Sequence, residues 1–234
     1  VNLQKVEFSE DSQLEIIGNH AFSETLIETI VIPKHVTEIK DFAFNDCISL
    51  NEIIISQNSE LKTIGQFAFS NSQIKSIKLP QSIIELKDKC FNYIPNLTLF
   101  SISPKNKFYS FFDDKFIIKK INQSDNNYGE IVFARKDIKE AIIPSFIKRI
   151  SKFAFHNCGE IMKVEFLFNS ELKYIDEYAF DLTSITEITI PSSLKIIGKF
   201  AFSNCNKLKK VDFMNNPELE LIDENAFYGS PIES

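Results

Sequence analysis

Apolar residues return along the chain in one fixed register. A small residue followed by Phe occurs eight times, each time with aliphatic residues five and eight positions before the Phe. The Phe residues of this signature are Phe22, Phe44, Phe69, Phe91, Phe155, Phe180, Phe202 and Phe227. Successive ones lie 22 or 25 residues apart, except for one interval of 64 residues. A constant period of about 20 to 50 residues is typical of a solenoid, so the sequence predicts a repeat protein.

Each signature is followed by a short alternating segment. The pattern is L-x-x-I-x-I, as in Leu50-Ile53-Ile55 and Ile185-Ile188-Ile190. Its last two apolar residues enclose one outward residue, which is the period of a β-strand. We therefore expect one short strand per unit, stacked into a parallel sheet. The signature Phe side chains should point inward as a ladder, with each aromatic pair adding about 0.5–1.5 kcal/mol beyond burial.

The two repeat lengths have a local explanation. The shorter units end their strand in Pro, as at Pro33 and Pro80, and proline stops a strand because it cannot donate the next ladder hydrogen bond. The longer units carry a polar loop in its place. These loops are residues 57–60, 169–171 and 215–218.

The long interval is predicted to be an interruption within one domain. Phe108, Phe111 and Phe116 fall at the inward positions of a degenerate unit. Two alternating apolar runs, 116–118 and 131–133, flank the polar cluster 123–129, which indicates a β-hairpin. Residues 1–234 are thus expected to form a single solenoid domain, and both a packed spacer and a functional protrusion remain open for the hairpin. Its parts are N-terminal repeats 1–102, a degenerate repeat with the hairpin insertion 103–137, and C-terminal repeats 138–234.

The complete repeat resembles a known family. The string L-x-x-I-x-I-P, followed by an aliphatic pair and G-x-x-A-F-x-x-C, resembles the BspA-like class of leucine-rich repeats, and residues 185–205 carry it most fully. The resemblance implies a leucine-rich-repeat solenoid, a curved right-handed coil with a concave parallel β-sheet. It also implies short strands or 3-10 turns on the convex side and supports the mid-chain β-hairpin insertion. The chain departs from the pattern where Cys90 replaces Ala, and Gly precedes the signature only at Gly18, Gly65 and Gly198.

Composition and net charge limit the classes of partner that this chain can bind. The chain has 234 residues, 44% of them hydrophobic, and a formal net charge of −6, which argues against nucleic acid because that ligand needs a basic surface. No apolar run approaches the roughly 20 residues of a membrane span, so membrane anchoring is expected only outside this segment. The strand residues Leu3, Val6 and Phe8 stand at the start, Pro231 and Ile232 begin another strand at the end, and neither end shows a polar cap. Because solenoids need such caps, we interpret the chain as a fragment of a longer protein.

The four cysteines follow the repeat. Cys47, Cys158 and Cys205 each stand three residues after a signature Phe, and Cys90 occupies the Ala position. Equivalent positions in alternate coils lie roughly 9–10 Å apart at a strand spacing of about 4.8 Å. A disulfide needs Cα atoms within about 7 Å, so we expect four free thiols in small buried apolar positions.

No residue set for catalysis stands out. His20, His35 and His156 occupy three different registers, which favours loop or core roles over a shared site. We expect no Ser/His/Asp or Cys/His set in a common neighbourhood, and we find no phosphate-binding loop, zinc spacing or calcium loop. Asp113-Asp114 is interpreted as a turn pair, and the sequons at Asn96 and Asn122 are what chance allows in an Asn-rich chain. The sequence thus predicts no enzyme, metal, cofactor or small-molecule substrate.

The outward strand positions offer the candidate binding surface. Val31 and Ile54 stand in adjacent coils where polar residues are the default, and clustered exposed apolar residues mark binding surfaces. Ordinary β-propensity on a sheet face explains them equally well. The neighbouring column Glu140, Lys163, Glu187, Lys210 alternates in sign and is explained by cross-strand charge pairing. The binding residues expected on the concave face are Val31, Ile54, Lys78, Ile142 and Glu165.

Two functions fit these expectations. The BspA-like resemblance, to surface proteins of anaerobic bacteria and of parasitic protists such as trichomonads, implies a cell-surface or secreted adhesin and surface antigen. Its partner would be a protein of the host extracellular matrix or host cell. An intracellular leucine-rich-repeat scaffold fits the residues equally well. A hydrolase built on the hairpin is a third hypothesis, and a deep pocket with clustered polar groups would support it.

Overall fold

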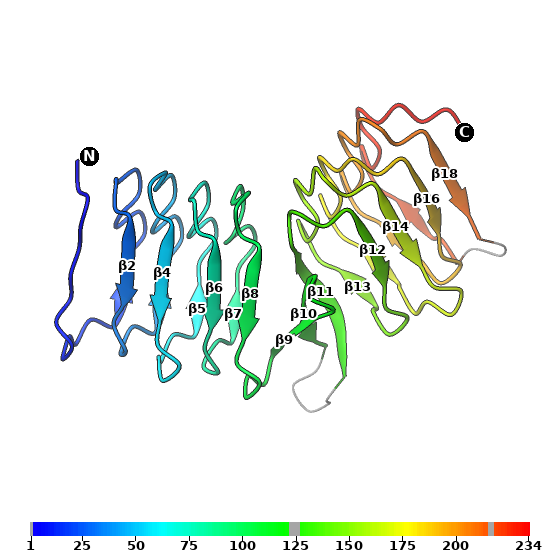
Figure 1. Cartoon of the computed structure of the whole chain (residues 1–234). Helices are drawn as coiled ribbons and strands as arrows, with labels where there is room; N and C mark the ends of the chain where they lie inside the picture. The colour runs from blue at the N-terminus through cyan, green and yellow to red at the C-terminus, as the bar shows by residue number, and fades with distance from the viewer. Residues whose placement is uncertain (1, 122–126, 215–217) are drawn as a thin grey trace. The chain divides into compact units, whose positions relative to one another are not determined.

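The structure is a computed structural model that describes residues 2–121, 127–214 and 218–234. The predicted hairpin-turn residues 123–126, the sequon at Asn122 and loop residues 215–217 lie outside the described residues. The described residues form a parallel β-solenoid of about nine turns and contain no helix, which confirms the predicted repeat fold (Figure 1). The chain divides into two compact units, Val1–Phe111 and Phe112–Ser234, called unit 1 and unit 2 below.

Both units contain one four-residue strand per coil, formed by the alternating segment after each signature. In unit 2 these strands make one parallel sheet in the order β12-β14-β16-β18, and in unit 1 they make two parallel pairs, β2-β4 and β6-β8. We call the outward side of these strands the long-strand face. Their bounds are β2 Thr29–Ile32, β4 Glu52–Ile55, β6 Ser76–Leu79, β8 Leu99–Ile102, β12 Glu140–Ile143, β14 Lys163–Phe166, β16 Glu187–Ile190 and β18 Lys210–Phe213.

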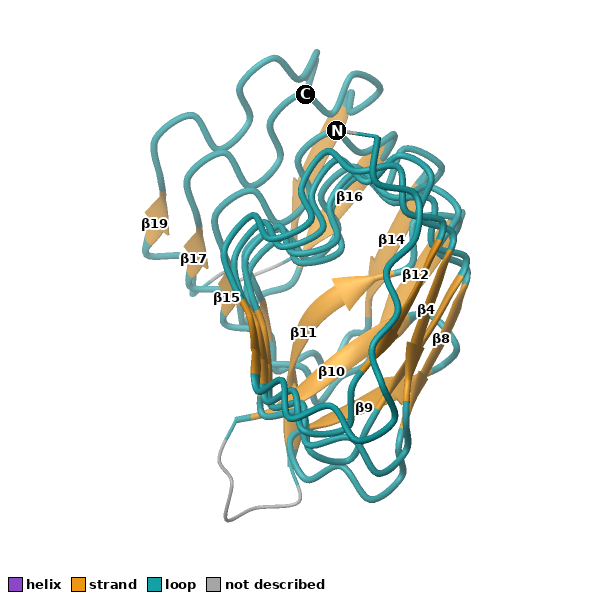
Figure 2. Cartoon of the chain, turned by 90° about the vertical axis from the view of Figure 1, so that its left-hand side faces the viewer, coloured by secondary structure: helices purple, strands orange, loops and turns teal. Residues whose placement is uncertain are grey.

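A second, two-residue strand lies on the other side of each coil, where the aliphatic residue five before the Phe points inward (Figure 2). These strands also pair in parallel from coil to coil, in the orders β1-β3-β5-β7 and β13-β15-β17-β19. Their bounds are β1 Ile16–Ile17, β3 Glu38–Ile39, β5 Thr63–Ile64, β7 Glu85–Leu86, β13 Arg149–Ile150, β15 Tyr174–Ile175, β17 Ile196–Ile197 and β19 Leu221–Ile222. The predicted short strands of the second side are therefore present.

The predicted hairpin is confirmed in unit 2. Strand β10 (Phe116–Lys120) pairs antiparallel with β11 (Tyr128–Ala134), and β11 continues the solenoid by pairing in parallel with β13. The preceding strand, β9 (Tyr109–Phe112), crosses the boundary between the units. Asp113 and Asp114 form the turn after β9, as predicted, and both have a φ of 51°.

The signature itself forms a tight turn with an unusual backbone. Its residues two before and two after the Phe have positive φ, for example 59° at Phe42 and 57° at Asp46, which is costly for residues other than glycine. Bonds of the 3-10 type close the turn, such as Ala43 N to Lys40 O at 3.3 Å. Successive turns also bond to each other, as where Phe44 N donates to the carbonyl of Ala68 at 2.8 Å. Hydrogen bonds between stacked coils thus stabilise the positive-φ backbone of the turn, which a single coil would not stabilise by itself.

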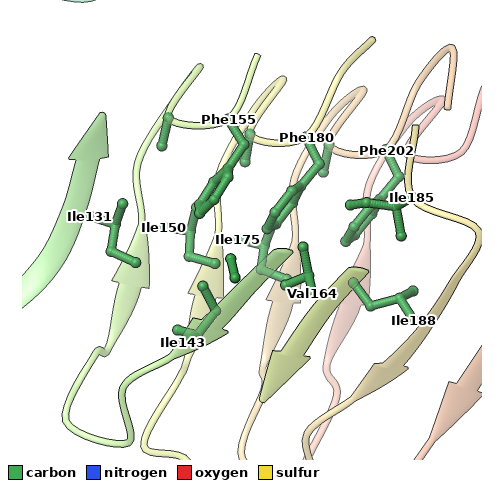
Figure 3. Packing of buried hydrophobic residues seen from close by; sticks show 14 of the residues in the cluster. Ile131, Ile143, Ile150, Phe155, Val164, Ile175, Phe180, Ile185, Ile188 and Phe202 are labelled. Atoms are coloured by element: carbon green, nitrogen blue, oxygen red, sulfur yellow. The ribbon is translucent and has the colours of Figure 1, made fainter. Parts of the chain in front are cut away.

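The signature Phe residues form the predicted inward ladder. Phe44, Phe155 and Phe202 are fully buried, while Phe22 and Phe227, in outermost coils of the two units, are half-buried. Neighbouring rings are nearly parallel with centroids about 5 Å apart, for example 5.0 Å between Phe180 and Phe202 (Figure 3). Offset stacking of this kind is a favoured aromatic geometry. Aliphatic residues of both strand types close the core around the rings.

A second aromatic ladder runs beside the first and was not predicted. The residue two before the Phe stacks on its equivalent in the next coil, as in Phe42 on Phe67 at 5.1 Å and Tyr178 on Phe200 at 5.0 Å. His20 belongs to this ladder, because its ring lies 4.9 Å from that of Phe42. This stacking explains the aromatic residues at a half-buried, positive-φ position.

The degenerate repeat differs from the prediction. Phe116 is buried as expected, but Phe108 and Phe111 are only half-buried and Tyr109 fills the core instead. The cause is Asn106, whose Nδ2 donates to the Ile83 carbonyl at 2.9 Å and whose Oδ1 accepts from Tyr109 N at 2.8 Å. The register therefore shifts, and the Tyr109 hydroxyl accepts a hydrogen bond from Leu86 N at 3.1 Å.

The predicted first strand is also wrong. Residues 2–8, including Leu3, Val6 and Phe8, carry no strand, although Leu26 N donates to the Leu3 carbonyl at 2.9 Å. Leu3 therefore contacts the coil of Leu26 through the backbone, but the segment does not form the ladder that defines a strand.

Candidate functional site

The long-strand face of unit 1 is mostly uncharged and carries an exposed apolar pair. Val31 and Ile54 are direct partners in the β2–β4 register, with exposed fractions of 53% and 43%. The inward residues beside them, such as Ile30 and Ile53, are buried, so the strands keep one apolar side for the core and a second apolar side for solvent. Because no core contact requires an apolar side chain at an outward position, this pair is available for a partner.

The remaining outward residues of unit 1 carry few charges. Strand β6 lies beside β4, and its Lys78 is paired in register with Ser101 of β8. Leu99 adds a third exposed apolar side chain, with an exposed fraction of 66%. The eight outward strand residues of this unit are Thr29, Val31, Glu52, Ile54, Ser76, Lys78, Leu99 and Ser101, of which Glu52 and Lys78 are charged.

The same face of unit 2 has a different chemistry. Glu140, Lys163, Glu187 and Lys210 are neighbours in register and alternate in sign, as predicted. The ion pairs themselves run along the strands. Lys163 contacts Glu165, and Lys210 contacts Asp212 at 2.6 Å. The hydrogen bond and charge of Glu165 raise the pKa of Lys163, so both lysines of this face are paired within their own strands.

The structure brings the predicted binding residues together in two groups. Val31, Ile54 and Lys78 lie on the long-strand face of unit 1, whereas Ile142 and Glu165 are register partners on that of unit 2. Ile142 is half exposed at 50%, but Glu165 is already engaged with Lys163. A binding role for any of the five residues stays a prediction.

Three buried polar residues of unit 2 form a cluster that sequence reasoning missed. His156, Asp181 and Ser203 each directly follow a signature Phe, in three successive coils, and are at most 5% exposed. The His156 Nδ1 lies 3.0 Å from Asp181 Oδ2, and the Ser203 hydroxyl donates to Asp181 Oδ1. The expectation that no Ser, His and Asp share a neighbourhood is therefore wrong. Reading that register as a column would have found the cluster.

The order of the cluster points to a structural role. Asp181 stands between the serine and the histidine, whereas an activated serine needs the histidine as its direct partner. Asn204 Nδ2 also donates to Asp181 Oδ1 at 3.1 Å. Burial acts to raise the pKa of Asp181, but hydrogen bonds from His156, Ser203 and Asn204 outweigh it and lower the pKa. The carboxylate is thus held charged in the turn layer and ties three coils together.

The four cysteines are free and buried, and two of them also form hydrogen bonds between coils. The Cys47 thiol donates to the Phe22 carbonyl at 2.9 Å, and that of Cys205 donates to the Phe180 carbonyl at 3.2 Å. Ser230, in the same register, makes an equivalent bond to the Phe202 carbonyl at 2.7 Å. Desolvation raises the pKa of all four thiols, which disfavours the reactive thiolate.

A pocket of about 370 Å³ lies beside the hairpin in unit 2. Its apolar wall comes from Ile121, Tyr128 and Phe146, and Asn127 adds one polar group. Lys148 and Glu171 complete the lining with their charged groups 3.7 Å apart. The part of the chain that the structure describes holds no cluster of three or more metal-ligating His, Cys, Asp or Glu residues, and no helix there could cross a membrane.

Residues 15–129 and 126–234 match the family described as the BspA type leucine rich repeat region, in 6 copies. The two segments together span most of the chain. A search of curated proteins found no match.

Solved structures show the same fold. The pneumococcal vaccine antigen PcpA superposes with a TM-score of 0.76 at 19% identity, over 97% of this chain and 64% of that chain. The chain therefore spans less than two thirds of PcpA. A leucine-rich repeat protein from Eubacterium ventriosum has a TM-score of 0.71 at 18% identity, over 96% of this chain and 82% of that chain. A leucine rich cell surface protein from Faecalibacterium prausnitzii has a TM-score of 0.56 at 18% identity, over 87% and 70%.

Proposed function

Because the chain belongs to the BspA-type leucine-rich repeat family, we propose that it is a non-enzymatic protein-binding module of a surface or secreted adhesin. Its partner is a protein of the host extracellular matrix or of the host cell surface. Leucine-rich repeats suggest protein–protein interaction and are generally non-enzymatic. The extended strand faces of a solenoid suit this role because they present many side chains in fixed register.

The observation that carries the proposal is the exposed Val31–Ile54 pair. Side chains at outward strand positions gain nothing from the core. Of the four equivalent residues of unit 2, Glu165, Thr189 and Asp212 are polar, and Ile142 is a single apolar residue without an apolar partner beside it in register. An apolar pair bordered by a charged residue has the composition of an interface centre, where a few desolvated residues supply most of the binding energy. Lys78 is the charged border of the binding surface.

The surface or secreted location is supported by the named neighbours. PcpA is described as a vaccine antigen, and the Faecalibacterium prausnitzii protein as a cell surface protein. At 18–19% identity these likenesses concern the fold. The location of this chain is therefore proposed and requires its own test.

The test is a binding assay against immobilised host matrix proteins and intact host cells. The double variant Val31→Asp with Ile54→Asp should weaken binding strongly, by about 30-fold or more if the pair is the interface centre. A matched control places the same two charges on unit 2, as Thr186→Asp with Thr189→Asp, because both threonines are exposed. The control should bind like the parent. Both variants should stay folded with a modestly lower melting temperature, because each places like charges opposite each other in the sheet.

Two outcomes would contradict the proposal. Equal binding by the unit 1 variant and the parent would show that the Val31–Ile54 pair is not the binding centre. Recovery of partners only from the producing organism's own cytosol, with none from host matrix or cells, would support the scaffold hypothesis instead.

A further inference from the structure

Phe168 is the most exposed large apolar side chain of the described residues, with an exposed fraction of 94%. It stands twelve residues before its signature Phe, in the loop after β14. The equivalent residue in unit 1 is Gln57, which is also exposed. The repeat therefore does not require an apolar residue here, and the phenylalanine needs another explanation.

Two nearby residues depart from the repeat in the same way. Leu167 is 42% exposed where unit 1 has Ser56, and Phe146 is 37% exposed where other coils carry residues such as Glu60 and Ser193. The loops that hold them lie in adjacent coils and are joined, because Glu171 N donates to the Ser145 carbonyl at 2.8 Å. An apolar rim has thus formed on unit 2 at positions that are polar in unit 1.

The same rim contains the pocket described above. Phe146 is part of its wall, and the loop that carries Phe168 also supplies Glu171 to its lining. The volume of about 370 Å³ is at the small end of the range for binding pockets, large enough for an aromatic side chain. Adjacent loops of unit 2 therefore present an exposed phenyl ring and an apolar pocket with an aromatic wall.

The charges of this surface are self-complementary as well. Lys148 and Glu171 have exposed side chains, 53% and 58%, and pair with each other at 3.7 Å within one chain, so each can exchange this partner for the opposite charge of a second copy. In a pair related by a two-fold axis, residue i meets residue j and j meets i, so a surface with one knob, one pocket, one cation and one anion matches itself.

We propose that unit 2 associates with a second copy of this chain through this rim. Phe168 of each copy enters the pocket lined by Tyr128 and Phe146 of the other, and Lys148 of each copy faces Glu171 of the other. The interface is small, so the dissociation constant is expected in the range of roughly 10–500 µM. The proposal is independent of the Val31–Ile54 surface, because all its residues lie in unit 2.

The first test is sedimentation velocity of the whole chain over a concentration series up to about 1 mM. The parent should shift from monomer to dimer, and Phe168→Ser should raise the dissociation constant by about 30-fold or more. Gln57→Ser, the same change at the equivalent position of unit 1, should behave like the parent. A parent that stays monomeric throughout, or a Phe168→Ser variant that associates like the parent, would overturn the proposal.

Charge reversal tests the partner directly. Lys148→Glu and Glu171→Lys should each weaken self-association, because like charges then face each other. An equimolar mixture of the two variants should form a mixed dimer, since each charge again meets its opposite across the interface. No mixed dimer, with each variant folded by circular dichroism, would show that a second copy is not the occupant. The Val31→Asp with Ile54→Asp variant should dimerise like the parent, which separates this proposal from the adhesin proposal.

Discussion

The two units have the same type of core, each within itself, and differ on their long-strand faces. In both, inward Ile and Val residues pack against a ladder of parallel Phe rings, for example Phe44 on Phe69 in unit 1 and Phe180 on Phe202 in unit 2. Outward, unit 1 presents the neutral pair Val31 and Ile54. Unit 2 presents one row of charges that alternate in sign and a second row that consists of Ile142, Glu165, Thr189 and Asp212. The repeat fixes what points inward and leaves the outward positions free, so a difference between outward faces carries information about partners.

A second difference lies in the turn layer. In unit 2 the residues directly after the signature residues Phe155, Phe180 and Phe202 are His156, Asp181 and Ser203, and these contact one another. In unit 1 the same register holds neutral residues, such as Asn45, which donates to the neighbouring Asp46 at 2.6 Å. Unit 2 is therefore expected to be the more sensitive of the two to acid.

The largest expected effect is loss of the ring ladder. Phe202→Ala should lower the free energy of unfolding by about 3–5 kcal/mol, because the ring is fully buried and its neighbours cannot collapse into the space. Phe44→Ala should act similarly in unit 1. The measurement is denaturant unfolding of both variants and the parent. A midpoint for either variant equal to that of the parent would mean that the inward ladder is not a main source of stability.

Asp181→Ala should lower the free energy of unfolding by about 3 kcal/mol, because it leaves the buried partners His156 and Ser203 without their acceptor. Asn45→Ala, in the equivalent register of unit 1, should cost about 1 kcal/mol, the contribution of one ordinary hydrogen bond. The same unfolding experiment compares them. Equal losses of unfolding free energy in the two variants would contradict a difference between the turn layers of the two units.

Acid should reduce the contribution of Asp181. Its pKa is lowered in the folded state, so it stabilises the fold above the ordinary aspartate pKa of about 3.9 and loses this effect as pH falls through the lower folded value. The stability difference between the parent and Asp181→Asn should therefore be largest near neutral pH and shrink below about pH 4. Unfolding curves from pH 7 to pH 2 check this, and a difference that grows in acid would contradict it.

The smallest expected effect is the reactivity of the four cysteine thiols in the native protein. Burial raises the pKa of all four, so the native protein should react very slowly with a thiol reagent at pH 8. In denaturant without reductant, four thiols should titrate. Fewer than four from a monomer would mean that a disulfide forms, and fast native labelling of Cys47 or Cys158 would show that its unit opens locally.

The repeat made much of the core predictable. Period-two alternation around each Ile and Val predicts the long strands, and the shared register predicts that Val31 lies beside Ile54, as the structure confirms. Close backbone contacts explain two of the three glycines before the signature. A Cβ at Gly65 would lie 2.5 Å from the Asp41 backbone nitrogen and one at Gly198 would lie 2.9 Å from the Asp176 backbone, whereas nothing lies within 4 Å at Gly18.

Features that depend on single side chains in the interruption were not predictable from the repeat. Asn106 shifts the register by bonding to carbonyls of the preceding coil, which makes Tyr109 rather than Phe108 the buried residue. The exposure of Phe168 was missed because a loop between strands has no period to indicate which side chains it buries. The His156–Asp181 contact could not be predicted from the registers of the histidines alone, because it joins residues of two neighbouring coils.

The most direct test of the central claim is side-chain footprinting of the chain bound to its protein partner. Val31, Ile54 and Ile142 have similar exposed fractions, 53%, 43% and 50%, so hydroxyl-radical labelling of the free chain should modify all three. We expect labelling of Val31 and Ile54 to fall on binding while that of Ile142 is unchanged. Protection of Ile142, with Val31 and Ile54 labelled as in the free chain, would place the partner on unit 2 and contradict the account.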